Sequence, residues 1–154
     1  MMSKEELVTK IPEKIREYLI EEFGDLRPSH ITMAKYNPLM LEGFATFRRA
    51  ILPGKRDPQG ALPKYVKEII SVVIEVVLGK GGGEDGPGVL HTRKAIREGA
   101  TPEMIHEAMA LCFFLAGMTC YVQYGLKCVK AAEEEYKKIS EEHGSKVGES
   151  ISRM

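Results

Sequence analysis

Apolar residues recur with helical spacing along most of the chain. The first set predicts a helix over residues 3–24, because its members are four residues apart and share one side: Leu7, Ile11, Ile15, Leu19 and Phe23. We expect this helix to dock through that side and to end near Gly24. The stretch 25–38 that follows contains two prolines and shows no sustained period.

Asn37 and Pro38 form a start signal for a second helix, over residues 38–52. Met40, Phe44 and Phe47 follow at spacings of four and three residues, so they share one side of that helix. We predict that this side faces the protein interior.

The next helix is predicted over residues 63–78, where apolar residues occupy most of the circumference. Such a helix belongs in the middle of a domain or at a subunit contact. Residues 80–88 then include five glycines and one proline, which predicts a loop with high backbone freedom, able to fold over a pocket as a lid.

A short helix over 89–98 is predicted to end at Gly99 in a left-handed cap, and Thr101 starts a helix that runs to about residue 142 with a break at Gly117. The polar tail 144–154 is expected to be frayed. No strand pattern or internal repeat is visible. The pattern predicts an all-α fold of about six helices.

The length of 154 residues, with 44% hydrophobic residues, favours a single domain over 1–154. Twenty-two basic and twenty-two acidic residues cancel, so no net positive charge attracts nucleic acid or an anionic membrane surface. The longest apolar run, 108–122, is shorter than the roughly 20 residues that span a bilayer. Residues 1–10 carry charges instead of the apolar stretch of a secretory signal, so we expect a cytoplasmic protein.

Three cysteines, Cys112, Cys120 and Cys128, are odd in number and eight residues apart. This spacing favours neither a disulfide framework nor a zinc site. We expect reduced thiols that pack as small apolar side chains.

One segment has a specific spacing that starts at a histidine. His91, Ala95, Gly99, Ala100, Thr101, Glu103, Ile105, Glu107 and Ala108 follow the pattern H-x-x-x-A-x-x-x-G-A-T-x-E-x-I-x-E-A. This pattern resembles the signature of the carboxymuconolactone decarboxylase and alkylhydroperoxidase D superfamily. The sequence GALPKYVKEII at 60–70 resembles the start of that family's central helix, and Ala116-Gly117 matches a small pair found further on. The resemblance covers about 38–131 and implies an oligomeric helical bundle.

In the peroxidase branch of this family, two cysteines precede the histidine in the motif C-x-x-C-x-x-x-H. Counted back from His91, those positions hold Glu84 and Pro87. The two-step disulfide chemistry of that branch therefore has no cysteine pair here.

The resemblance leaves Glu68 and His91 at the family's glutamate and histidine positions, as the expected catalytic residues. His91 is predicted in the first turn of its helix, where the dipole favours a neutral imidazole that can act as a base. The competing interpretations are structural. His91 would bond a loop carbonyl, and Glu68 would form a rim ion pair with Lys64, Lys67 or Arg93.

Further candidate residues are Glu75, Glu84, Cys120 and Tyr121. Glu75 stands in an apolar stretch seven residues after Glu68, so the two carboxylates can share one side of a helix as an acid/base set or, with His91, as metal ligands. The alternative for Glu75 is a cation across a subunit interface. We predict no cofactor and no bound metal.

Three functions remain open at this stage. The first is thiol-independent proton transfer or decarboxylation on a small organic acid or lactone, by His91 and Glu68. The second is an alkylhydroperoxidase D-like peroxiredoxin activity that uses a lone cysteine, and the third is a non-catalytic helical oligomer. The resemblance implies a homotrimer or homohexamer, and the two very apolar helices independently favour association.

Overall fold

The computed structural model describes residues 4–80, 83 and 86–152, with side chains from residue 6 to residue 142. All regular secondary structure in this part of the chain is helical, which confirms the predicted all-α class. The chain forms two compact units, residues 1–61 and 62–154. The interpretation as one domain stays a prediction.

Unit 1 is built from the helices α1 (Lys4–Thr9), α2 (Glu13–Phe23), α3 (Pro28–Tyr36) and α4 (Pro38–Ile51). The single helix predicted over 3–24 is wrong, because the chain breaks after α1 and Pro12 starts α2 as its N-cap. The stretch 25–38 holds α3, a helix too short to show a sustained period. The predicted start of α4 is confirmed, since the Asn37 side chain accepts a hydrogen bond from the backbone N–H of Met40 at 3.1 Å.

The predicted inner face of α4 is wrong. Leu41 and Ala45 are the buried residues of this helix. Met40 and Phe47 are 57% and 70% exposed, and Phe44 is 36% exposed. The physical reason is that α4 has two apolar rows, and α2 and α3 pack against the row with smaller side chains. Met40 and Phe47 remain uncovered within unit 1, whereas the ring of Phe44 contacts His30 with centroids 5.8 Å apart.

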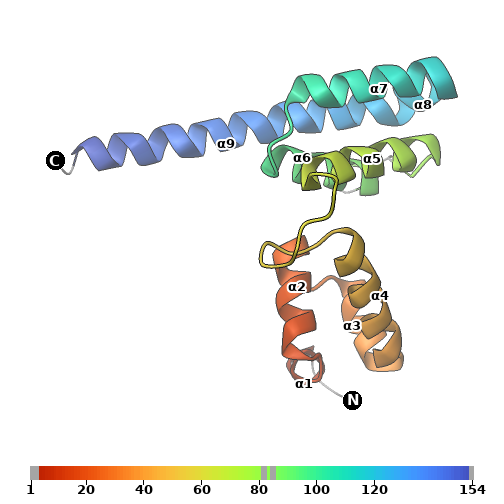
Figure 1. Ribbon diagram of the computed structural model, residues 1–154, viewed down its shortest axis with the longest axis vertical. Helices are drawn as coiled ribbons and strands as arrows, with labels where there is room; N and C mark the ends of the chain where they lie inside the picture. Colours follow the sequence, from red (N-terminus) through yellow and green to blue (C-terminus); the bar gives the residue numbers. More distant parts are fainter. Residues whose placement is uncertain (1–3, 81–82, 84–85, 153–154) are drawn as a thin grey trace. The chain divides into compact units, whose positions relative to one another are not determined.

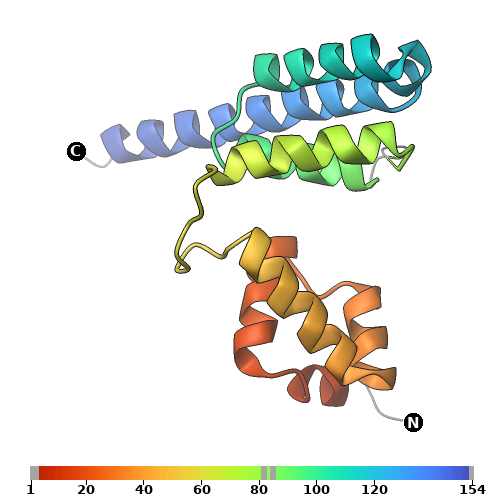
Figure 2. The ribbon, with the colours of Figure 1, turned by 45° about the vertical axis from the view of Figure 1, so that its right-hand side comes forward.

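Unit 2 contains α5 (Lys64–Val77), α6 (Pro87–Arg97), α7 (Pro102–Ala116), α8 (Met118–Cys120), the π-helix η1 (Tyr121–Gly125) and α9 (Leu126–Ser152). In Figures 1 and 2, α7 lies along the first part of α9, α5 and α6 lie together beside them, and α9 extends well beyond its neighbours. The buried core draws on all of the longer helices, with Val72, Ala95, Met109 and Cys128 as examples.

Two glycines end helices of unit 2 as the sequence indicates. Gly99 follows α6 with φ of 105°, and Gly117 separates α7 from α8 with φ of 97°, both in the region that a side chain disfavours. Thr101 caps α7, since its hydroxyl accepts a hydrogen bond from the N–H of Met104 at 3.4 Å. The tail predicted to be frayed is helical in its backbone up to Ser152.

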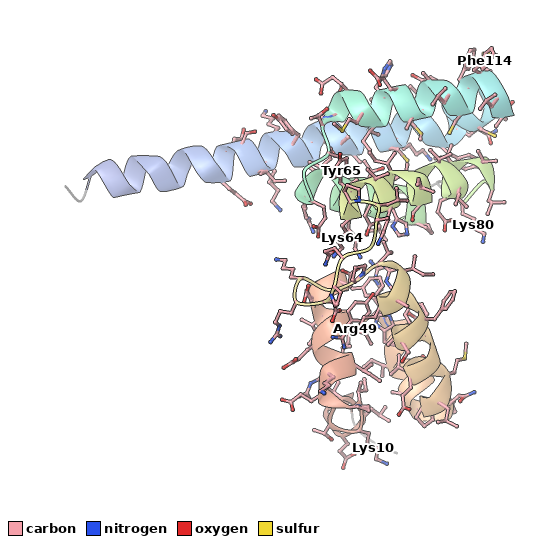
Figure 3. All side chains as sticks on the ribbon, in the orientation of Figure 1. Lys10, Arg49, Lys64, Tyr65, Lys80 and Phe114 are labelled. Carbon is pink, nitrogen blue, oxygen red and sulfur yellow. The ribbon has the colours of Figure 1, made fainter. Side chains whose placement is uncertain are left out.

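The apolar run 108–122 is not one buried helix, because Gly117 divides it. Only one side of α7 reaches the core, through Ile105, Met109 and Cys112. Phe114 and Leu115 are 80% and 77% exposed, and Figure 3 shows Phe114 pointing away from the other helices of unit 2. Unit 2 therefore has an uncovered apolar surface along α7 and α8.

His30 is a buried polar residue of unit 1, only 2% exposed. Its Nδ1 accepts a hydrogen bond from the backbone N–H of Arg27 at 3.2 Å, and its ring packs against Phe23 with centroids 4.9 Å apart. Burial lowers the pKa of His30 below its ordinary value, and the nearby cations Arg27 and Arg48 lower it further. Glu22, on α2, pairs with Arg48 at 3.3 Å. The folded unit 1 therefore favours the neutral form of His30.

The preference for a neutral His30 predicts that unit 1 loses stability in mild acid. The pKa of His30 is lower in the folded than in the unfolded chain, so the unfolded chain binds the proton more readily. The contribution of neutral His30 to the stability of unit 1 is complete above the ordinary pKa of 6.5. It is lost as the pH falls through the lower pKa that His30 has in the folded chain. Hydrogen exchange of the α3 amides, corrected for intrinsic rates, should show reduced protection at pH 5.5 compared with pH 7.5. The variant His30→Gln should remove most of that dependence, and an unchanged dependence would assign it to other groups.

Candidate functional site

Glu68 and His91 meet between α5 and α6. The Oε2 atom of Glu68 lies 2.5 Å from Nδ1 of His91. Glu68 is fully buried, whereas the His91 side chain is 17% exposed. The structure thus brings together the two residues that the sequence singled out, with the histidine on the solvent side of the carboxylate.

The ion-pair alternative for Glu68 is wrong, and Nδ1 of His91 contacts that carboxylate. Lys64 pairs with Glu98 at 3.2 Å instead of with Glu68. Glu68 is buried against His91, so it is not part of a rim ion pair, and the ring nitrogen of His91 faces a carboxylate instead of a loop carbonyl. The pair of Lys64 and Glu98 was missed in the sequence, although Glu98 stands at the predicted end of α6.

The predicted position of His91 in its helix needs a correction. The helix α6 begins at Pro87 with Gly86 as its N-cap, so His91 lies in the second turn. The field of the helix dipole weakens within the first turn, so the helix start acts less strongly on a residue of the second turn. Proline is favoured at the first helical position, and Pro87 was the signal for the true start.

The contact relates the tautomer of His91 to the charge on Glu68. An ionised carboxylate only accepts hydrogen bonds, so a neutral His91 donates its Nδ1–H to Glu68. The lone pair is then on Nε2, the nitrogen that points away from the carboxylate. A carboxylate that orients a histidine in this way also stabilises the imidazolium formed when Nε2 takes up a proton. The pair is chemically suited to proton transfer.

The α5–α6 seam is the row of polar residues formed by Lys64, Glu68 and Glu75 on α5 and by His91 and Glu98 on α6. Figure 3 labels Lys64 at the beginning of α5 and Lys80 just after its end. Oε1 of Glu68 and Oε2 of Glu75 are buried, and neither accepts a hydrogen bond from the residues described here. Glu68 and Glu75 both lie in α5, where their spacing of seven residues places them on one side of the helix.

The other predicted candidates lie apart or outside the described residues. Glu84 is not among the described residues. Tyr121 belongs to η1, where its ring packs against Phe113 with centroids 5.9 Å apart. Cys120 is half-buried, and its thiol donates to the carbonyl of Ala116 at 3.8 Å. No contact of Tyr121 or Cys120 with Glu68 or His91 occurs among the hydrogen bonds and ring contacts of the described residues.

The cysteines are free thiols in the core of unit 2. Burial raises the pKa of Cys128 and of Cys112, and for Cys112 the neighbouring Cys120 raises it further. A raised pKa keeps a thiol protonated at neutral pH, whereas the thiolate is the nucleophile. Cys112 and Cys128 are therefore poor peroxidatic residues.

Two further observations concern metal binding and membrane insertion. Within the described ranges, no group of three or more histidine, cysteine, aspartate or glutamate side chains is arranged to hold a metal ion. None of the helices in the same part of the chain combines the length and the apolar character needed to cross a membrane.

Comparisons with known proteins agree with the fold and the motif. The model of the carboxymuconolactone decarboxylase family matches residues 38–130. A crystal structure of a candidate carboxymuconolactone decarboxylase from Burkholderia xenovorans LB400 is similar with a TM-score of 0.73 and 21% sequence identity, over 91% of this chain and 98% of that one. No curated protein matches the sequence. At that identity the crystal structure supports the fold alone, whereas the family model covers more than half of the sequence. The chain belongs to the carboxymuconolactone decarboxylase family.

Proposed function

We propose that the protein catalyses thiol-independent proton transfer or decarboxylation on a small organic acid or lactone, with His91 as the proton-transferring residue and Glu68 as the residue that positions it. The observation that carries this proposal is the 2.5 Å contact between the buried Glu68 carboxylate and Nδ1 of the partly exposed His91. The contact engages Nδ1, so in this proposal a ligand meets the ring at Nε2.

The chemistry of such a step balances without a cofactor. In proton exchange, Nε2 removes a proton from the carbon next to a lactone carbonyl and later returns it. In decarboxylation of a carboxylactone, the bond to the carboxylate carbon breaks, its electron pair passes toward the lactone carbonyl, and carbon dioxide leaves. Nε2 in its protonated form then delivers a proton to the carbon. Glu68 stabilises the imidazolium in both cases.

Two assays test the proposal. The first follows deuterium incorporation from heavy water into an unsaturated γ-lactone by NMR, and the second follows carbon dioxide release from carboxymuconolactone, the compound in the family's name. We expect catalysis above the buffer rate in at least one assay. Catalysis in neither, together with peroxide turnover that requires Cys120, would favour the peroxiredoxin alternative. Catalysis in none of the three would favour the non-catalytic oligomer.

Thiol alkylation gives an independent prediction. Iodoacetamide should label Cys120 first, because Cys112 and Cys128 are more deeply buried and have raised pKa values. We expect catalysis to be retained, since the cysteines are not part of the proton path. The control is Cys120→Ser, which should also keep its activity. Loss of activity in both the alkylated protein and this variant would show that Cys120 takes part in the reaction.

We also propose that the protein assembles as a homotrimer or as a homohexamer built from trimers. The support is the apolar surface along α7 and α8, where Phe114, Leu115 and Met118 are exposed, together with the outer side of α5 with Ile70 and Ile74. Light scattering at micromolar concentration should give three or six times the chain mass of 17.2 kDa. Phe114→Glu should lower that mass, and a wild-type monomer would contradict the prediction.

A further inference from the structure

The side of α4 that unit 1 leaves open carries no charged residue. The residues opposite the buried Leu41 and Ala45 form what we call the α4 face: Leu39, Met40, Gly43, Phe44, Phe47 and Ile51. The charged residues of α4, Glu42, Arg48 and Arg49, stand outside this row by helical spacing. A partner that binds through charges, such as a nucleic acid, therefore finds no ion pair on the α4 face.

The uncovered area of the α4 face is large enough for a specific interface. Leu39 and Phe47 are 76% and 70% exposed, and Met40, Ile51 and Phe44 are 57%, 49% and 36% exposed. At about 200 Å² for each large side chain, these fractions correspond to roughly 600 Å² of apolar surface. Two such surfaces would bury about 1,200 Å² together, the lower end of the range for specific protein interfaces.

Gly43 stands in the middle of the α4 face. Glycine within a helix is less favourable than alanine, so its presence there needs a structural reason. Packing within the chain supplies none. Apart from its chain neighbours and the backbone of its own helix, no atom of the described residues lies within 4 Å of the place where a Cβ on Gly43 would be. The absence of a side chain lets another helix approach α4 closely at this point, between Met40 and Phe47.

A second copy of the chain has a surface that fits. In a two-fold symmetric interface the same surface occurs on both partners, and this arrangement is the commonest in homo-oligomers. The α4 face meets that condition about Gly43, because Leu39 and Phe47 stand four residues to either side of it. In an antiparallel crossing centred there, Gly43 lies against Gly43 of the second copy, and Phe47 packs against Leu39 of the second copy.

We propose that the α4 faces of two copies cross at Gly43 and form a two-fold interface that joins two trimers into a hexamer. The trimer contact of the proposed assembly uses the apolar surface along α7 and α8 of unit 2, so the two interfaces use separate surfaces. Three α4 contacts act together between two trimers, which compensates for the modest area of each contact. The inference rests on the proposed assembly for the trimer alone, and different variants test the two contacts.

Light scattering of the full chain at micromolar concentration gives the first test. We expect six times the chain mass of 17.2 kDa for the wild type. Phe47→Glu places a charge in each α4 face, so its mass should fall to three chains. Phe114→Glu should instead leave pairs of chains that dissociate on dilution. A wild-type mass of one or three chains, or six chains retained in Phe47→Glu, would overturn the proposal. A wild-type mass of two chains that falls to one in Phe47→Glu would support the α4 interface and refute only the trimer.

Ile20→Glu is the matched control, because Ile20 is an apolar residue of another helix, α2, and is 41% exposed. Its mass should equal that of the wild type. Circular dichroism of Phe47→Glu and Ile20→Glu checks that the helices are intact in both. Equal loss of the hexamer in the two variants would mean that any new charge on unit 1 disrupts assembly, which contradicts a specific role of the α4 face.

A cysteine at the crossing tests the two-fold symmetry. In a Cys120→Ser background, Gly43→Cys should form a disulfide between two copies under mild oxidation. A disulfide requires Cα atoms within about 7 Å of each other, and a residue meets itself only near the two-fold axis. Ile20→Cys in the same background is the control and should remain as single chains on a denaturing gel. Single chains in both variants, or covalent dimers in both, would overturn the two-fold crossing at Gly43.

Discussion

Replacement of His91 by alanine is expected to reduce the rate of proton exchange or decarboxylation by about 10²- to 10⁴-fold, the range for loss of a general acid or base. The reason is that the proposed function uses Nε2 of His91 as the proton acceptor, since Nδ1 is engaged by Glu68. Binding of a lactone should weaken much less, because the imidazole contributes to the transition state more than to the ground state.

Glu68→Gln is the companion variant. Its amide can also present an N–H to Nδ1, which would favour the other tautomer of His91 and remove the lone pair from Nε2. The rate should therefore fall although His91 is still present. The control is His106→Ala, which removes an exposed histidine of α7. Deuterium incorporation measured by NMR on all three variants checks the prediction. Equal rates in the wild type and in His91→Ala would refute the proposed proton path.

The second prediction with a large effect concerns the free energy of unfolding of unit 2. Met109 is fully buried in α7, and its Sδ atom lies 3.3 Å from where a Cβ on Gly125 would be. Met109→Ala would leave a cavity between α7 and η1, because the helices on either side are also packed against α9. We expect the free energy of unfolding to fall by about 2–5 kcal/mol, the usual range for such a truncation in a core.

Met104→Ala is the matched control, since Met104 lies on the same helix and is 39% exposed. Its effect should be much smaller, because no closed cavity forms around an exposed position. Urea unfolding followed by circular dichroism measures both variants. Similar losses in the two variants would mean that the core of unit 2 is not organised around Met109.

Helix positions were predictable where the sequence carries a local signal. Asn37 and Pro38, Thr101, Gly99 and Gly117 mark helix ends by capping and backbone preference, and the structure confirms each of them. These signals depend only on neighbouring residues. They do not require knowledge of which surfaces meet in the folded protein.

The face that a helix buries was harder to predict. The row of Met40, Phe44 and Phe47 has larger apolar side chains than the row of Leu41 and Ala45, but the second row is the buried one in unit 1. Both rows satisfy helical periodicity. The choice between them depends on the partner helices and on assembly, which a single sequence does not specify. The π-helix over Tyr121–Gly125 was likewise missed, since no pattern of residue types marks the extra residue in its turn.

For the candidate site, the sequence identified the two residues but did not show how they contact each other or which of them is buried. Glu68 and His91 were selected by resemblance to the family motif, and the antiparallel packing of α5 and α6 brings them together over 23 positions of sequence. The burial of Glu68 behind His91 could not be predicted from either helix alone. In the proposed function, that arrangement gives the two residues different tasks: His91 transfers the proton and Glu68 positions the ring.

The protonation of the His91 ring tests the central claim most directly. Two-dimensional ¹H–¹⁵N NMR at neutral pH distinguishes a nitrogen that carries a proton from one that carries a lone pair. The geometry predicts a proton on Nδ1, held by Glu68, and a lone pair on Nε2, with this pattern lost in Glu68→Gln. A proton on Nε2 of the neutral ring, or a pattern unaffected by Glu68→Gln, would contradict the role proposed for the pair.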